Sequence, residues 1–185
     1  MTAEHRVSGQ AAAASFDPRE FRHALGCFAT GVAVVTARDA QGGPVGLTIN
    51  SFASVSLDPP LVLWSLSLYS PSLAAFQHCS HYAINILSAD QTEYSQHFSR
   101  PGETAAGKFA GIAFDEGAGG APLLRDCCAW FECRNETRHP GGDHLIFVGL
   151  VEAFRRAQRQ RPPLLFHGGR YRHLATDPSP EEQRS

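Results

Sequence analysis

The sequence predicts a mainly β fold, in which a small closed or partly closed antiparallel barrel carries a few helices on its outside. Several short runs of apolar and β-branched residues are separated by turns rich in Gly, Pro and Asp. The chain does not alternate strands with helices in the way that a doubly wound parallel sheet requires. Its 185 residues suit one compact domain.

We expect three parts along the chain. Residues 1–15 are small and polar, which predicts a disordered leader. Residues 16–174 contain the periodic apolar segments and form the expected domain. Residues 175–185 are polar and contain proline, which predicts a flexible tail.

The first helix is expected to begin at Pro18. Asp17 can accept N–H bonds as the N-cap, proline suits the first helical position, and Glu20 can close a capping box. Apolar residues then recur at helical spacing, namely Phe21, Leu25 and Phe28. The pattern predicts a short amphipathic helix that ends before Gly31.

Further helical segments are expected in the middle of the chain. Ser70-Pro71 predicts a helix through Cys79 with Ser70 as its N-cap. Residues 88–91, Ser-Ala-Asp-Gln, have the capping-box pattern and predict a helix through Phe98. Residues 99–122 are Gly-rich and weakly periodic, so we expect mostly loop with a helical turn near Lys108.

The extended runs have the composition of strands. Residues 32–36 and 45–48 flank a turn cluster at 39–44, which predicts a hairpin. Asp58-Pro59-Pro60 forces an extended or turn geometry, because the residue before proline is disfavoured in the helical region. Further extended runs lie at residues 61–66, 82–87, 128–134, 144–154 and 169–174.

Composition disfavours several classes of partner. The formal net charge is −2 and no Lys/Arg-rich run occurs, so we expect no nucleic-acid partner. No apolar stretch reaches the roughly 18 residues that span a bilayer, so we expect no membrane contact. The five cysteines are odd in number and no signal peptide precedes them. These features predict reduced thiols in a soluble, cytoplasmic protein.

Familiar nucleotide, metal and hydrolase motifs are absent from the sequence. Neither GxGxxG nor GxxxxGK[ST] occurs, and Gly117-Ala118-Gly119-Gly120 has the wrong spacing for either. The run His78-Cys79-Ser80-His81 crowds metal-ligand types without the usual zinc spacing, so no metal is expected. A serine hydrolase is disfavoured because GxSxG is missing.

The most informative segment is residues 46–56. It places neutral hydroxyl and amide groups between apolar neighbours, at Thr48, Asn50, Ser51, Ser54 and Ser56. Such groups suit the rim of a planar, hydrogen-bonding ring such as isoalloxazine. A strand whose polar side chains face water explains the same residue types, and on residue types alone that interpretation is favoured.

Two other segments could carry chemistry. Gly141-Gly142-Asp143-His144 precedes an apolar run and can place an imidazole beside a bound ring, although an ordinary hairpin turn has the same composition. Residues 166–171, Phe-His-Gly-Gly-Arg-Tyr, could cover a cofactor face. A terminal hairpin that packs Tyr171 into the core explains this segment equally well.

Together these motifs resemble the short-chain flavin reductase family, the reductase components of two-component flavin-dependent monooxygenases. The resemblance runs from about Phe21 to Leu174. It is carried, in order, by FATGV at 28–32, GLTINSFASVSLDPPLV at 46–62, AINIL at 83–87, KFAG at 108–111, GDHLIFVG at 142–149 and GRY at 169–171.

The resemblance implies an FMN-binding split barrel, an antiparallel Greek-key barrel that forms a homodimer with flavin sites near the subunit interface. It implies an NAD(P)H:flavin oxidoreductase that reduces a dissociable FMN or FAD with NADH or NADPH, and it favours NADH. The reduced flavin would pass to a partner monooxygenase. Alternatives are a non-catalytic flavin- or haem-binding split barrel and an oxidase of a pyridoxine-type substrate.

The resemblance also implies roles for individual residues. His144 would orient the nicotinamide as the catalytic residue, with Asp143 and Tyr171 nearby. The flavin ring and ribityl chain would lie along Thr48, Ile49, Asn50, Ser51, Ala53 and Ser54, with Ser65, Leu66 and Asn85 also lining the site. Ser99, Arg100 and Lys108 would serve the phosphate, although Arg100-Pro101 departs from the family's usual texture.

Overall fold

The computed structural model describes residues 16–100, 105–159 and 161–175. The predicted leader and the predicted tail beyond Ala175 lie outside these residues. The helices are α1 (Pro18–Gly26), α2 (Leu73–His78), α3 (Thr92–Ser99), α4 (Ala105–Lys108) and the 3₁₀ turn η1 (Ala118–Gly120). None of the helices within the described ranges is long and apolar enough to cross a membrane.

Strands dominate the fold and confirm the predicted class. They are β1 (Thr30–Gly31), β2 (Ala33–Arg38), β3 (Pro44–Ile49), β4 (Ala53–Leu57), β5 (Pro60–Ser67), β6 (His81–Ile86), β7 (Phe114–Glu116), β8 (Pro122–Leu124), β9 (Ala129–Gly141), β10 (His144–Arg156), β11 (Leu165–His167) and β12 (Arg170–Arg172). The predicted hairpin forms between β2 and β3, which pair in antiparallel register.

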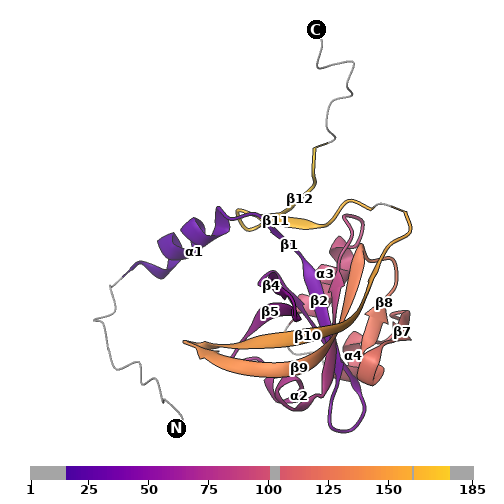
Figure 1. Ribbon diagram of the computed structural model, residues 1–185. Coiled ribbons are helices and arrows are strands. Elements are labelled where there is room, and N and C mark those ends of the chain that lie inside the picture. Colours follow the sequence, from indigo (N-terminus) through magenta and orange to yellow (C-terminus); the bar gives the residue numbers. More distant parts are fainter. Residues whose placement is uncertain (1–15, 101–104, 160, 176–185) are drawn as a thin grey trace, which may run out of the picture.

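Seven strands form one curled antiparallel sheet in the order β3-β2-β6-β9-β10-β5-β4. Figure 1 shows the long β9–β10 ribbon reaching away from the body, while α3, α4, β7 and β8 lie together on one side. A separate three-stranded sheet has the order β1-β11-β12, and β7 pairs with β8. The strands at the ends of the large sheet, β3 and β4, are joined by residues 50–52.

Apolar side chains pack in two main layers, one inside the curled sheet and one outside it. Trp64 is at the centre of the inner layer, stacked on Phe147 at 4.5 Å between ring centroids, with Phe76 and Tyr82 against its edges. The outer layer packs Phe98 and Phe109, among others, against the sheet. A Cβ at Gly46 would lie 3.0 Å from Phe98, so glycine there lets α3 approach β3 closely.

The helix starts correct two of the predictions. Ser70 does not cap α2, because its hydroxyl accepts the N–H of Ser72 and forms a turn, and the helix begins at Leu73. Before α3, the Gln91 side chain accepts the Ser88 N–H as a capping box requires, at 3.0 Å. The Ser88 hydroxyl donates to the Asp90 carboxylate, with the Asp126 carbonyl also 3.0 Å from its oxygen, so this box is only half formed.

The first helix is capped as predicted, but its capping box is absent. Asp17 accepts the Arg19 N–H at 2.8 Å, and proline occupies the first turn. The Glu20 carboxylate lies 3.5 Å from His23 Nδ1 instead of reaching back to the N-cap. The helix buries none of its residues.

Two strand predictions were too short or missing. Residues 99–122 were expected to be mostly loop, yet they contain β7 and the start of β8. Strand β9 continues seven residues beyond the predicted Arg134, because it pairs along the whole length of β10 to Gly141. In both cases the pairing is with the next strand along the chain, and the composition of each segment taken alone does not report it.

Gly149 is required by the inner layer, which generates a stability prediction. A Cβ at this position would overlap the Tyr82 hydroxyl and lie 2.8 Å from Tyr82 Cζ and 3.0 Å from Cys133 Cβ. Because Tyr82 and Cys133 are fully buried, neither can move into free space. We expect Gly149→Ala to lower the free energy of unfolding by about 2–3 kcal/mol, measured by urea denaturation.

Gly31 offers the matched control. A Cβ built on it meets nothing within 4 Å, and its backbone needs no left-handed conformation. Gly31→Ala should therefore change stability by less than about 0.5 kcal/mol. Equal losses in the two variants would contradict this account of the inner layer.

Candidate functional site

Strands β3 and β5 do not pair with each other in the curled sheet. The side chain of Ser51, just after β3, connects them instead. Strand β4 pairs with β5 only from Pro60 to Leu63. Farther along β5, the Ser51 hydroxyl accepts the Ser65 N–H at 3.0 Å and donates to the Ser65 carbonyl at 3.2 Å. Ser51 thus fastens the end of β3 to β5 and leaves a split at the loop formed by residues 50–52.

This loop presents unused hydrogen-bond donors. Within the part of the chain that the structure describes, no acceptor is found for the backbone N–H groups of Asn50, Ser51 and Phe52. The Asn50 side chain is exposed, and so are Ala53 and Ser54 at the start of β4. Asn50 is exposed and Ser51 and Phe52 are partly exposed, so these donors are open to water or to a ligand that supplies acceptors.

Thr48 and Tyr171 are linked by hydrogen bonds to the same residue, Ser95, which sequence reasoning missed. The Thr48 hydroxyl donates to the Ser95 carbonyl at 2.7 Å, and Ser95 Oγ lies 2.9 Å from Tyr171 Oη. Ser95 is fully buried in α3. The available signal was a polar residue three positions before the core residue Phe98, on the same face of the helix.

Thr30 is a second residue that sequence reasoning did not single out. Its hydroxyl oxygen is buried and has no hydrogen-bond partner among the described residues. In the three-stranded sheet Thr30 pairs with Phe166, and Phe166 pairs with Tyr171, so the three side chains form one row on one face. Phe166 therefore lies between the Thr30 hydroxyl and Tyr171, and an unpaired buried hydroxyl of this kind is unusual in a folded protein.

Asp143 and His144 occupy the tip of the β9–β10 ribbon. His144 lies opposite Ser67 of β5, and its Nδ1 is 2.7 Å from Asp143 Oδ1. The hydrogen bond and charge of His144 lower the pKa of Asp143 below its ordinary value. When Nδ1 carries the proton shared with this carboxylate, Nε2 is the ring nitrogen left to face a ligand. The side chain of His144 is 43% exposed, so it is accessible.

The structure does not bring Tyr171 to His144 within one chain. Tyr171 lies in β12 on the outer layer, whereas His144 lies at the ribbon tip beside β5. Among the described residues, no hydrogen bond or ring contact joins them.

Three of the predicted flavin residues have side chains that belong to the interior. Asn85 is fully buried, where its amide donates to Val34 O and Thr36 Oγ1 and its carbonyl accepts the Leu124 N–H. Ile49 and Leu66 belong to the inner apolar layer. The side chain of Asn85 therefore holds β6 to β2 and β8.

The predicted phosphate residues lie beside a separate pocket. Arg100 and Lys108 line a pocket of about 760 Å³, which also touches Gly46 of β3 and the ends of α2 and β6. Lys108 Nζ donates to the Phe98 carbonyl at 3.0 Å. Ser99 is exposed, and its hydroxyl donates to the Gln96 carbonyl at 2.8 Å. None of the predicted ring residues is among those that line this pocket.

Positive charge collects around this pocket. Arg38 adds to Arg100 and Lys108, against the carboxylate of Asp39, and the imidazoles of His78 and His81 also line the pocket. Arg38 is held in place by the Gly120 and Gly42 carbonyls and by Glu116. A pocket of this sign suits an anionic group.

Cysteine and metal chemistry find little support in the described residues. All five cysteines are unpaired, and burial raises the pKa of the Cys127 and Cys133 thiols to about 12. A thiol with a raised pKa is a poor nucleophile. Across the described ranges, no group of three or more His, Cys, Asp or Glu side chains could hold a metal ion.

Comparison with known proteins decides the family. Residues 25–175 match the model of the flavin reductase like domain. The chain belongs to the flavin reductase family. It is 48% identical over 153 residues to the FMN reductase (NADH) SmoA of Agrobacterium fabrum, a match that covers 83% of this chain and 84% of that protein.

Other relatives agree. The flavin-dependent monooxygenase reductase subunit HsaB of Rhodococcus jostii is 39% identical, over 91% of this chain and 84% of its own. The NADH:FAD oxidoreductase SgcE6 of Streptomyces globisporus has a similar structure, with a TM-score of 0.81, 35% identity, and coverage of 90% of this chain and 99% of that one. A probable flavin reductase of Rhizobium meliloti is longer, and the match covers 44% of it.

Asn50 and Ser51 have different roles in the structure, which leads to a prediction. Asn50→Ala should weaken flavin binding without lowering thermal stability, because no partner of its side chain is found in the described residues. Ser51→Ala should lower both flavin affinity and thermal stability, since it leaves the Ser65 N–H and C=O without a partner. We expect about 1–3 kcal/mol of lost stability for Ser51→Ala. Melting curves and flavin fluorescence titrations measure the two effects, and a stable Ser51→Ala protein would contradict the closure by Ser51.

Proposed function

We propose that this chain is an NAD(P)H:flavin oxidoreductase that reduces a dissociable flavin at the split of the barrel. The observation that carries the proposal is the loop of residues 50–52, with its unused N–H donors between Thr48 and Ser65. Flavin rings present carbonyl and imine acceptors along their edge, which such donors match. Membership of the flavin reductase family supports the same ligand.

The chain's own residues bind and orient the reactants. A bound flavin accepts a hydride from the nicotinamide, so no side chain needs to act as a nucleophile. The N–H groups of residues 50–52 hold the ring and stabilise negative charge that develops on it. His144, held by Asp143, would orient the nicotinamide for transfer to a bound flavin. The cationic pocket beside Arg100 and Lys108 takes the phosphate end of the flavin.

Relatives indicate the reactants and the recipient of the product. SmoA is named as an FMN reductase that uses NADH, which favours NADH as the donor here and FMN as one acceptor. HsaB is named as the reductase subunit of a flavin-dependent monooxygenase. We infer that this chain likewise supplies reduced flavin to a partner monooxygenase. Its five free cysteines fit the reducing cytoplasm.

The decisive experiment is an assay of NADH consumption with and without added free flavin. NADH oxidation that depends on FMN or FAD supports the reductase. Tight flavin binding without NADH consumption would contradict it and favour a non-catalytic flavin-binding protein. Stopped-flow reduction of FMN and FAD by NADH and NADPH then identifies the preferred pair.

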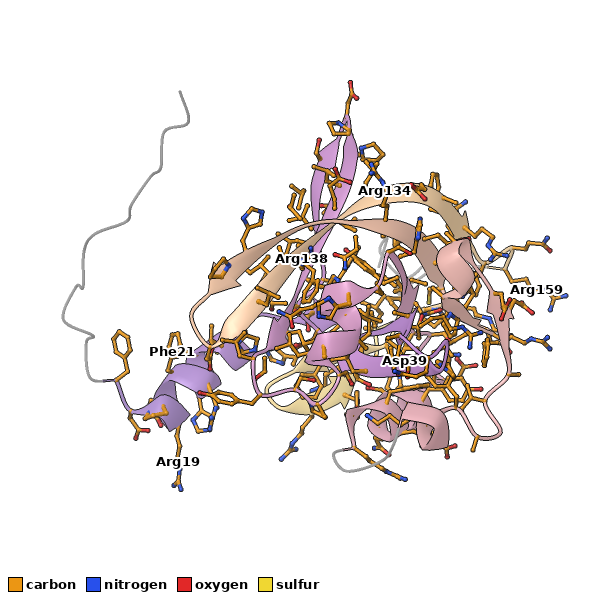
Figure 2. All side chains as sticks on the ribbon, turned by 90° about the horizontal axis from the view of Figure 1, so that it is seen from below. Arg19, Phe21, Asp39, Arg134, Arg138 and Arg159 are labelled. Atoms are coloured by element: carbon orange, nitrogen blue, oxygen red, sulfur yellow. The ribbon has the colours of Figure 1, made fainter. Side chains whose placement is uncertain are left out.

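A homodimer would cover the exposed face of α1. Phe21 and Leu25 of α1, and Phe28 just after the helix, are 51%, 59% and 78% exposed. Figure 1 shows α1 standing away from the barrel, and Figure 2 shows Phe21 on this helix at the edge of the molecule. Large exposed apolar faces are costly in water and mark interfaces, and a two-fold dimer is the commonest assembly.

The first prediction from the proposed function concerns His144. His144→Ala should lower hydride transfer or raise the KM for the nicotinamide by about tenfold to a thousandfold, roughly 1.4–4 kcal/mol of transition-state stabilisation. Flavin affinity should change far less, because the lost contact is with the second substrate. Stopped-flow kinetics and a melting curve test this. A lower melting temperature with normal kinetics would make His144 a folding residue.

The second prediction concerns α1. The double change Leu25→Ser and Phe28→Ser should convert the dimer to a monomer in light scattering, because it makes two of the three exposed apolar side chains polar. Arg22→Ser, on the same exposed helix, is the matched control and should leave the dimer intact. A wild-type protein that scatters light as a monomer contradicts the assembly.

A further inference from the structure

We propose that the pocket beside Arg100 and Lys108 binds an adenosine diphosphate group, that of FAD, so that this chain binds FAD more tightly than FMN. The inference rests on the proposed function and names the preferred flavin, which that function leaves open. It follows from the size of the pocket, from the charges that remain available in it and from the side chains of α2 and β6 that line it.

The pocket is larger than a flavin phosphate needs. Its volume is about 760 Å³. This volume lies within the range of about 300–1,000 Å³ that is typical of sites for whole small ligands. The lining runs from Arg100 and Lys108, past Gly46 of β3, to the turn between β2 and β3 and to α2. A phosphate held by Arg100 and Lys108 would leave most of this space to water.

Two of the cations that line the pocket suit an anionic ligand. The guanidinium of Arg38 is already used, since it donates to two backbone carbonyls and forms an ion pair with Glu116 at 2.7 Å. Arg100 is exposed. Lys108 donates to a backbone carbonyl, and an ammonium group keeps its charge when its partner is neutral. Arg100 and Lys108 therefore provide the positive charge for a diphosphate.

Asp39 brings a carboxylate to the same pocket, where it suits a sugar hydroxyl. Its Oδ1 accepts the N–H groups of Gln41 at 3.0 Å and of Gly43 at 2.7 Å, which fixes the carboxylate in the turn between β2 and β3. A carboxylate repels a phosphate, whereas the hydroxyls of a ribose can donate to it. The pocket thus combines cations for phosphates with an acceptor for the ribose.

Two imidazoles in the pocket offer flat surfaces to a base. His81 has both ring nitrogens engaged within the protein, since Nδ1 lies 3.0 Å from Ser80 Oγ and Nε2 lies 3.2 Å from a Glu152 oxygen. Its ring face is what remains for a ligand. His78 is exposed at the end of α2, and Ala74, one helical turn earlier, is exposed too. A purine base stacks on aromatic rings of this kind, and histidine is among those used.

FAD is favoured over NADH as the source of the adenosine diphosphate. Both dinucleotides carry this group, so the chemistry of the pocket fits either one. The proposed function assigns the flavin phosphate to Arg100 and Lys108, and in FAD the second phosphate and the adenosine are attached to that phosphate. His144, which would orient the nicotinamide, is not among the residues that line the pocket.

The test compares FAD with FMN by isothermal titration calorimetry. We expect the wild type to bind FAD about tenfold more tightly than FMN, because stacking of one base supplies that much affinity. Ala74→Trp adds bulk to the pocket from an exposed position. It should weaken binding of FAD by about tenfold. It should change binding of FMN by less than about threefold. Ala113→Trp, at an exposed alanine that does not line the pocket, is the matched control and should preserve the preference for FAD.

His78→Ala is a second test that removes a ring instead of adding one, and it should weaken FAD more than FMN. Equal affinities of the wild type for the two flavins overturn the inference, and so do equal losses of FAD and FMN affinity in Ala74→Trp. If Ala74→Trp instead raises the KM for NADH at saturating FMN and leaves FAD affinity unchanged, the pocket binds the nicotinamide dinucleotide and the assignment to FAD is wrong.

FMN-dependent NADH oxidation by the wild type reports the proposed function separately. Turnover together with equal affinities for FAD and FMN refutes the preference for FAD and leaves the reductase function standing. A wild type that binds neither flavin refutes both.

Discussion

At the split of the barrel, the hydroxyl of Ser51 takes the place of a neighbouring strand. Because β4 leaves β5 after Leu63, the Ser65 N–H and C=O would otherwise be unpaired beside the apolar interior. A single hydroxyl satisfies both groups and lets the chain turn outward immediately before β4. The turn is what frees the N–H groups of residues 50–52 from the sheet, so closure of the barrel and exposure of the donors have one cause.

Some polar residues around this opening form their hydrogen bonds within the protein, and other polar groups remain available to a ligand. Asn85, Ser95 and Ser51 use most of their hydrogen-bonding capacity within the protein. What remains is mainly backbone donors and lone pairs, fixed by these bonds. Rigid neutral groups of this kind orient a planar ring at little entropic cost. Asn85, Ser95 and Ser51 therefore influence the orientation of a ligand even though they are bonded within the protein.

Local patterns predicted the first helix, the β2–β3 hairpin and most of the long strands, because β-branched runs, capping residues and turn residues act over a few positions. They missed β7, the start of β8 and the last seven residues of β9. The start of α2 was wrong because Ser70 accepts the Ser72 N–H and forms a turn. The family resemblance placed Asn85 in the flavin site, yet its side chain is occupied by Val34, Thr36 and Leu124, which are distant in sequence. Thr48 and Asn50 were predictable as polar positions in an apolar segment. The link from Thr48 through Ser95 to Tyr171 was not, since it joins three elements that only the fold brings together.

Charge placement bears on how firmly such a site holds its product. Reduction adds negative charge to the ring, and a cation against the ring would stabilise the reduced form and slow its release. Within the described residues, the hydrogen bonds of Thr48 and Ser51 involve no Lys or Arg, and the cations collect instead in the pocket beside Arg100 and Lys108. The protein thus has charge available for the phosphate end, which keeps its charge in both oxidation states. A flavin ring bound at residues 50–52, whose charge changes on reduction, would meet neutral dipoles there. This separation suits a protein that must bind a flavin, reduce it and let it go.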